Sequence, residues 1–452
     1  MEQTTSTILS LIGLLFFFGF AGFGIISYRE GERRAMRVAF MLAASTGMIF
    51  FLAALLPSSI KLVLIIISSL SVLALFVLFL LPIGKVSMGG DTPQKRYDER
   101  DIVFARARLK PGSPEFASYY HLHPDKKAVD ERTRAKAGLL SPNARLGNPY
   151  LFASPEGSFF LTGELRQAVD GTVSAERREL PSDRMTAYLK SLAGYYGALQ
   201  VGITELKPYH VYSHTGRGTG KYGSPIPLDY DYAIAFTVEM DYEMMGNSPE
   251  AQVVMESAKQ YVESARIAVQ LAAAIRAMGY PARAHIDGNY RLIAPLVARD
   301  AGLGEIGRMG LLMSPHHGPR VRLGVVTTNA VLIPDKRVPD YSVIDFCNIC
   351  TKCAENCPSK SICFGERKEI DGALRWQINA ETCFHYWNVI GTDCGRCMVV
   401  CPYSHPANIS HNLIRWGSTK SGAFRRAANW MDNLFYGKHP APRDAPGWTK
   451  LP

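Results

Sequence analysis

Eight of the nine cysteines fall into two groups with the spacing of iron–sulfur ligands. The first group is a C-x2-C-x2-C-x3-C run closed by Pro358, and the second ends in C-x2-C-x3-C closed by Pro402, with its first cysteine displaced. The members are Cys347, Cys350, Cys353 and Cys357, then Cys383, Cys394, Cys397 and Cys401. This pattern is typical of bacterial ferredoxins with two [4Fe–4S] clusters, in which the last cysteine of each run binds the other cluster.

Crosswise ligation of this kind defines two predicted sets. Cluster 1 takes Cys347, Cys350, Cys353 and Cys401, and cluster 2 takes Cys357, Cys383, Cys394 and Cys397. Cys363 is left over, and we expect it to be a small buried apolar residue. Two zinc sites are the competing interpretation, but zinc thiolates come in paired C-x2-C knuckles rather than a four-cysteine run closed by proline. Clustered cysteines used for metal binding favour a reducing compartment.

Three long apolar runs precede these motifs. Residues 7–27, 38–56 and 62–83 are each long enough to cross about 30 Å of hydrocarbon. Three runs in series exclude a lone signal peptide. The loop of residues 28–37 carries four arginines, and Lys85, Lys95, Arg96 and Arg100 follow the third run. The positive-inside rule therefore predicts a multi-pass protein of the cell inner membrane whose large C-terminal part is cytoplasmic.

The charge of the chain fits the same interpretation. Its 452 residues have a formal net charge of +10, which basic flanks beside membrane spans explain. A Lys/Arg-rich aromatic stripe, which would favour nucleic acid as a partner, is not found in the sequence.

The middle of the chain alternates helical and strand patterns. We expect a helix at 183–196, strands within 198–206 and at 232–240, and a long helix from Pro249, capped by Ser248, to Gly279. Strands at 280–285 and 321–327 follow. The fold class is therefore α/β or α+β. The expected domains are a three-helix anchor (1–84), a linker and wrapping segment (85–184), a core (185–340), a ferredoxin-like domain (341–415) and a tail (416–452).

Taken in order, several stretches of residues 96–415 resemble the catalytic subunit of cobalamin-dependent reductive dehalogenases. They are ERDIVFARARLKPGS (99–113), IRAMGYPARA (275–284), DAGLGEIGRMGLLMSPHHGPRVRL (300–323), VLIPDKRV (331–338), FCNICTKCAENCPSKSI (346–362) and CMVVCPYSHP (397–406). The resemblance implies a nitroreductase-like core that binds cobalamin, a ferredoxin-like two-cluster domain, and an organohalide substrate. Epoxyqueuosine reductase, a related family, shares both cofactors.

The resemblance also assigns roles to particular residues. The family's catalytic tyrosine matches Tyr261, and the cation that would stabilise its phenolate matches Arg320, with Arg322 as the competing choice. The family often has Asn where this chain has Asp287; Asn289 competes for that role, and Asp287-Gly288 could be a simple turn. Outside this context, Tyr261 would be interpreted as a core tyrosine. The sequence lacks the Asp-x-His-x-x-Gly run that supplies a histidine to cobalt, so non-covalent, base-off binding is expected.

The resemblance extends to the membrane part. Glu30-Gly31-Glu32 resembles the Glu-x-Glu of the separate anchor subunits, where a quinol could deliver electrons; an ordinary charged loop is the alternative. A ferredoxin or flavodoxin is the other expected donor. The leading prediction is a membrane-anchored reductive dehalogenase. An epoxyqueuosine-reductase-like enzyme and a non-catalytic membrane electron-transfer module are the alternatives.

Overall fold

The computed structural model describes residues 2–81 and 86–450. Pro82 and Ile83, which end the third predicted span, and Lys85 lie outside the described residues. The chain divides into two compact units. The membrane unit comprises Met1–Ser87, Tyr341–Cys350 and Ala407–Asp444; the core unit comprises Met88–Asp340, Thr351–Pro406 and Ala445–Pro452. The boundary between the units thus falls inside the first cysteine motif.

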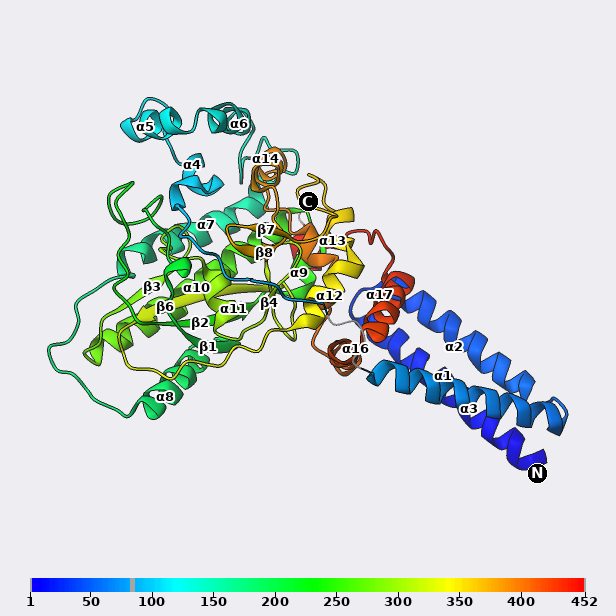
Figure 1. Ribbon diagram of the computed structural model, residues 1–452. Coiled ribbons are helices and arrows are strands. Elements are labelled where there is room, and N and C mark those ends of the chain that lie inside the picture. The colour runs from blue at the N-terminus through cyan, green and yellow to red at the C-terminus, as the bar shows by residue number, and fades with distance from the viewer. Residues whose placement is uncertain (1, 82–85, 451–452) are drawn as a thin grey trace. The chain divides into compact units, whose positions relative to one another are not determined.

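Three apolar helices dominate the membrane unit (Figure 1). They are α1 (Glu2–Arg29), α2 (Arg33–Ala53) and α3 (Ser58–Leu80), and each is long and apolar enough to cross a membrane, as the three predicted spans require. Small residues bring α1 and α2 close together: Gly13 lies against Phe50, and Gly47 lies against Phe17. Close approach at small residues is the usual basis of helix packing in lipid, where no hydrophobic effect drives association.

Three more helices complete the membrane unit: α12 (Tyr341–Cys350), α16 (Ile409–Lys420) and α17 (Gly422–Tyr436). Residues 416–452 were expected to form a tail, yet residues 416–436 are helical. Phe435 and Tyr436 pack against Ala35 and Ala39 of α2. Arg425 donates from Nε to Asp345 of α12 at 2.5 Å. This apolar inner face and its buried ion pair explain why the segment folds.

A four-stranded sheet forms the centre of the core unit. Its strand order is β1 (Gln200–Glu205), β2 (Tyr232–Glu239), β6 (Val321–Thr328), β3 (Ala282–His285). Every neighbouring pair is antiparallel, so of the two predicted classes the core is α+β, and all four predicted strands are confirmed. Gly324 lies opposite Phe236 because a Cβ there would come within 2.2 Å of the phenyl ring.

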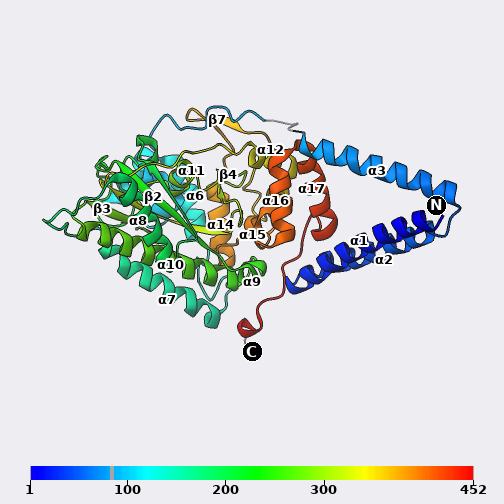
Figure 2. The ribbon, with the colours of Figure 1, turned by 90° about the horizontal axis from the view of Figure 1, so that it is seen from below.

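Helices cover both faces of this sheet, as Figures 1 and 2 show. Ile234 and Phe236 of β2 pack with α10 (Ala251–Ala277) and α8 (Ser182–Tyr195), whereas Ala233 and Ala235 pack with α11 (Ala294–Asp300). Burial on both faces explains why β2 is a continuous apolar run instead of alternating.

The helix that carries Tyr261 begins later than expected. Its first residue is Ala251, because the hydroxyl of Ser248 donates to the carbonyl oxygen of Cys394 at 2.7 Å instead of capping the helix. Its end is confirmed: Gly279 has φ +86°, the left-handed conformation in which helices commonly stop.

Shorter elements surround the sheet. The segment expected to wrap the core contains α4 (Val103–Ala107), α5 (Pro114–Leu122), α6 (Pro124–Arg134) and α7 (Pro149–Leu165), and α7 packs along α10. The remaining elements are α9 (Tyr242–Gly246), β4 (Glu305–Ile306), β5 (Leu312–Met313), α13 (Lys352–Glu355), β7 (Lys368–Ile370), β8 (Ala373–Arg375), α14 (Ala380–Ile390) and α15 (Arg396–Val399).

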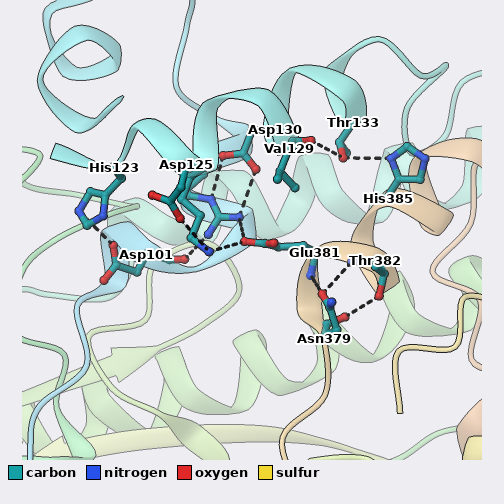
Figure 3. A network of polar contacts seen from close by, with 12 residues as sticks. Asp101, His123, Asp125, Val129, Asp130, Thr133, Asn379, Glu381, Thr382 and His385 are labelled. Atoms are coloured by element: carbon teal, nitrogen blue, oxygen red, sulfur yellow. Dashed lines mark hydrogen bonds and ion pairs between the residues drawn. The ribbon is translucent and has the colours of Figure 1, made fainter. Parts of the chain in front are cut away.

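A buried charge network fastens α6 to α14, the helix that carries Cys383 (Figure 3). Arg106 donates from Nε to Asp130 at 2.9 Å and from Nη2 to Glu381 at 3.0 Å. Lys126 donates to the same Glu381 oxygen at 2.9 Å. The Arg106 side chain is 3% exposed and that of Lys126 is 35% exposed. The two cations therefore differ sharply in solvation while sharing one acceptor.

We expect Arg106→Met to lower the free energy of unfolding by about 3–5 kcal/mol, because it leaves the buried carboxylate of Asp130 without its cationic partner. The control Lys126→Met should cost about 0–1 kcal/mol, since its pair is partly solvated. Denaturant unfolding of the detergent-solubilised protein measures both changes. Equal losses for the two variants would contradict this assignment.

Candidate functional site

A cavity of about 1720 Å³ opens in the core unit beside the middle of α10. Its wall includes Tyr261 from α10, Arg322 and Leu323 from β6, and Asp287 and Tyr290 from the loop after β3. Ligand pockets are commonly about 300–1,000 Å³, so this cavity has room for a ligand larger than most metabolites. Two buried polar atoms in its wall, Asp393 Oδ1 and Arg322 Nε, have no hydrogen-bond partner within the described chain.

Tyr261 is half-buried, and its ring lies in the cavity wall. The ring of Phe159 on α7 packs beside it, with 6.2 Å between centroids. The guanidinium carbon of Arg322 lies 4.6 Å from the centroid of the Tyr261 ring. A cation over the face of a phenol at this distance is in the range of a cation–π interaction.

Arg322 rather than Arg320 is therefore the cation beside Tyr261. Both residues precede or begin β6, but Arg320 is turned to other partners. It donates from Nη1 to Glu239 at 2.7 Å and from Nε to the carbonyl of Ser404 at 3.1 Å, and it also bonds the carbonyl of Met240. Its Nε and Nη1 donors are thus occupied by groups other than the tyrosine. This geometry favours Arg322, the competing choice, over Arg320, whose side chain joins β2 to the segment after Cys401.

Arg322 connects the tyrosine to a cysteine loop. Its Nη2 donates to Ser257 Oγ at 2.5 Å and to Asp393 Oδ2 at 3.3 Å. The Ser257 hydroxyl donates in turn to Asp393. Ser257 is one helical turn before Tyr261 on α10, and Asp393 directly precedes Cys394. Sequence analysis missed Ser257 and Asp393; the i, i+4 spacing of Ser257 to Tyr261 was the one available indication.

The structure separates the two candidates for the family's asparagine position. Asp287 lies in the cavity wall, where Arg166 Nη2 donates to its Oδ2 at 3.4 Å. Asn289 is 1% exposed, and its side-chain amide is already hydrogen-bonded within the protein. Its Oδ1 accepts from Arg283 at 2.8 Å, and its Nδ2 donates to the Arg166 carbonyl at 3.2 Å. Asn289 therefore holds the loop in shape, while Asp287 is the group available to a ligand.

Four cysteines of the core unit influence one another, two of them buried (Cys357 and Cys394) and two half-buried (Cys383 and Cys397). Cys357, Cys383, Cys394 and Cys397 are the set predicted for cluster 2, and their thiols influence one another electrostatically. Burial raises the pKa of Cys383 to about 11 and that of Cys394 to about 12. Binding of a metal by these thiols would have to displace their protons.

The other predicted set is divided between the two units. Cys353 and Cys401 are buried in the core unit, and the Cys353 thiol also influences Cys397. Cys347 and Cys350 lie on α12 in the membrane unit. Cys363, expected to be buried, is half-exposed, and its carbonyl accepts from Arg308 at 2.9 Å.

Opposing effects set the acidity of Tyr261. Arg322 is the largest influence on the Tyr261 pKa and lowers it, but burial and the carboxylates of Asp287 and Asp393 raise it. The net result is a pKa above the ordinary value of tyrosine, which is about 10. The phenol therefore keeps its proton at neutral pH, with the guanidinium of Arg322 beside its ring.

Known proteins are similar to parts of this chain. Residues 346–405 match the family model described as a 4Fe-4S dicluster domain. The tetrachloroethene reductive dehalogenase of Sulfurospirillum multivorans is 36% identical over 198 residues, which cover 42% of this chain and 39% of that protein. The protein of the same name from Desulfitobacterium hafniense is 32% identical over 213 residues, covering 45% and 38%. The chain thus spans about two fifths of the length of these curated relatives.

Solved structures agree with these relatives. The catabolic reductive dehalogenase NpRdhA is 26% identical with a TM-score of 0.64, over 79% of this chain and 49% of that one. One solved structure of that enzyme holds 3-bromo-4-hydroxybenzoic acid. Another similar structure is that of a reductive dehalogenase associated with B12-dependent dehalogenation, with the same TM-score of 0.64. The epoxyqueuosine reductase of Lactococcus garvieae is 34% identical over 122 residues, or 26% of this chain.

The position of Arg322 over Tyr261 predicts how the phenol titrates. Because Arg322 is the main influence lowering the Tyr261 pKa, Arg322→Gln should move that pKa further upward. Phenolate absorbance is recorded for each protein and for the same protein carrying Tyr261→Phe as well. The difference between the two titrations is the contribution of Tyr261. If Arg320→Gln shifts the Tyr261 pKa more than Arg322→Gln does, Arg320 is the cation that acts on the tyrosine.

Proposed function

We propose that this chain, a homologue of the reductive dehalogenases, is a membrane-anchored corrinoid iron–sulfur enzyme that replaces a halogen of an organohalide by hydrogen. The observation that carries the proposal is the pairing of Tyr261 with Arg322 in the wall of a cavity large enough for a corrinoid. An acid that is protonated at neutral pH, backed by a fixed cation, is what protonation of a carbon centre requires.

The cavity supports cobalamin as the cofactor. Its volume and the unpartnered polar atoms of Asp393 and Arg322 in its wall fit a large ligand with many amide groups. We propose non-covalent, base-off binding. When bound, cobalamin supplies the low-potential electron chemistry that breaks a carbon–halogen bond.

The protein's own residues would manage the proton. Exchange of halogen for hydrogen consumes two electrons and one proton and releases halide. Tyr261 donates that proton from its phenol oxygen, and Arg322 stabilises the phenolate that remains. Asp287, held by Arg166, lies where it can orient the substrate or return a proton to Tyr261.

The cysteines would carry the electrons. We propose two [4Fe–4S] clusters, the first on Cys347, Cys350, Cys353 and Cys401 and the second on Cys357, Cys383, Cys394 and Cys397. The electrostatic influences among Cys357, Cys383, Cys394 and Cys397 support their grouping, and Cys353 of the first set also influences Cys397. Asp393 precedes Cys394 and bonds Arg322, so the second cluster's loop is tied directly to the proton donor's cation.

The membrane unit would supply both location and electrons. We propose that α1, α2 and α3 cross the inner membrane with the loop of Glu30 and Glu32 on the cytoplasmic side. A membrane quinol is the proposed donor, and a ferredoxin or flavodoxin is the alternative. Quinol analogues added to inverted membrane vesicles distinguish the two donors, because the analogues would inhibit only electron transfer from quinol.

Anaerobic purification with cobalamin followed by halide release from aryl and alkenyl halides tests the proposed activity. We expect a corrin absorption spectrum, and a fall in turnover of about 10²–10⁴-fold in Tyr261→Phe, because general-acid catalysis contributes that much. Arg322→Gln should lose more turnover than Arg320→Gln, compared at equal amounts of folded protein.

Two results would redirect the proposal. Iron without any corrin would favour an electron-transfer module that serves another protein. Two observations together would favour an epoxyqueuosine-reductase-like enzyme. The purified protein would contain a corrin but release no halide, and a strain with the gene deleted would lack queuosine in its tRNA. Unchanged turnover in Tyr261→Phe would remove the tyrosine from its role as proton donor.

Iron content tests the cysteine assignment. The purified protein should hold roughly eight irons per chain. Cys383→Ser should lose about half of them, since Cys383 belongs to one proposed set. Cys363→Ser is the matched control, because Cys363 is half-exposed and belongs to neither set, and it should keep them all. Loss of iron from the Cys363 variant would overturn the assignment.

A further inference from the structure

The two C-terminal helices α16 and α17 lie at one end of the apolar helix bundle. The hydroxyl of Ser421, between them, donates to the carbonyl of Leu78 at 3.0 Å, and the ring of Phe424 packs 5.1 Å from that of Phe79. Leu78 and Phe79 belong to the last turn of α3. Phe435 packs on Phe23 near the end of α1, with 5.0 Å between ring centroids. Figure 2 shows α16 and α17 running across the spans rather than along them.

Polar contacts fix this helix pair to the loop between α1 and α2. Glu30 accepts from Asn408 Nδ2 at 2.5 Å and pairs with His411 Nε2 at 3.2 Å. Both side chains of the Glu30–His411 pair are less than 10% exposed. Arg443 donates to Glu32 at 3.1 Å. The helix pair therefore lies at the level where the three spans leave the apolar layer.

The two faces of α16 are reversed relative to a helix of a water-soluble protein. Ile409, Leu413 and Trp416 follow one another at i, i+4 and i+7, so they share one side. They are 89%, 59% and 53% exposed. The inward side instead buries His411, Arg415 and Ser418.

The outward side of both helices combines tryptophan with cations. Lys420 continues the α16 stripe, and its ammonium lies 5.3 Å from the Trp416 ring centroid. On α17, Trp430 is 65% exposed, and the exposed Arg426 lies one turn before it. Tryptophan beside Lys or Arg is the composition of protein surfaces at the boundary between lipid headgroups and acyl chains.

We infer that α16 and α17 form an interfacial helix pair that lies in the headgroup layer of the membrane spanned by α1–α3. Ile409 and Leu413 enter the edge of the acyl region, Trp416 and Trp430 lie at headgroup depth, and Lys420 and Arg426 contact anionic phosphates. The continuity of the helix pair with the span ends selects lipid as the occupant of this stripe. The inference concerns the membrane unit alone and holds whatever reaction the core unit performs.

Tryptophan quenching in the full-length protein tests the inference. The protein is reconstituted into phosphatidylcholine–phosphatidylglycerol vesicles with or without brominated acyl chains, which quench only indoles in contact with lipid. We expect Trp416→Phe combined with Trp430→Phe to remove more than half of the lipid-quenched emission. Trp376→Phe is the control, because Trp376 is 5% exposed inside the core unit and should contribute nothing to that emission.

Aqueous iodide provides the opposing measurement. We expect iodide to quench the Trp416 and Trp430 emission weakly in vesicles, and Lys420→Gln with Arg426→Gln to raise that quenching at least two-fold by loosening headgroup contact. An unchanged lipid-quenched component in the double Phe variant would overturn the inference. So would emission from Trp416 and Trp430 that neither agent quenches, since that result would place protein over the stripe.

Discussion

The guanidinium of Arg322 is the point on which the candidate site depends. It extends from β6, covers the ring of Tyr261 on α10, and bonds both Ser257 and Asp393. A buried cation is tolerated only where several acceptors compensate for its lost hydration, and here they come from different segments of the chain. Arg322 therefore holds α10, β6 and the loop before Cys394 together. A shift of any one of these segments would leave the guanidinium without one of its partners.

Much of this architecture follows from local patterns in the sequence. The three apolar runs and the two-sided apolar strand at Tyr232–Glu239 each have one dominant physical explanation, and the structure has the corresponding elements. The cysteine spacing lies within the stretch that matches the 4Fe-4S dicluster family model. Gly279 ended the helix as expected because an αL position has few alternatives. The resemblance carried by the motifs of residues 99–406 supplied what composition cannot: the expectation of a corrinoid and the choice of Tyr261.

Other features depend on tertiary contacts that spacing does not encode. Arg320 directly precedes β6 and Arg322 is two residues further on, and the contacts of Arg320 with Glu239 and the Ser404 carbonyl are what hold its side chain away from the tyrosine. Serine is a common helix cap, yet the hydroxyl of Ser248 donates to the carbonyl of Cys394 instead. The helices after residue 408 were missed because α16 turns its apolar side outward, so that pattern alone does not show what it packs against.

The membrane unit is built from the beginning of the chain and from a stretch close to its end, with most of the core unit encoded between them. Translation therefore separates the two halves of this unit by the time needed to make more than three hundred residues, on the order of tens of seconds. During that interval the spans are already present while Glu30 and Glu32 still lack His411 and Arg443. The membrane unit is therefore completed more than three hundred residues after its spans are made, and a ribosome that stops before residue 407 leaves Glu30 without its contact to His411.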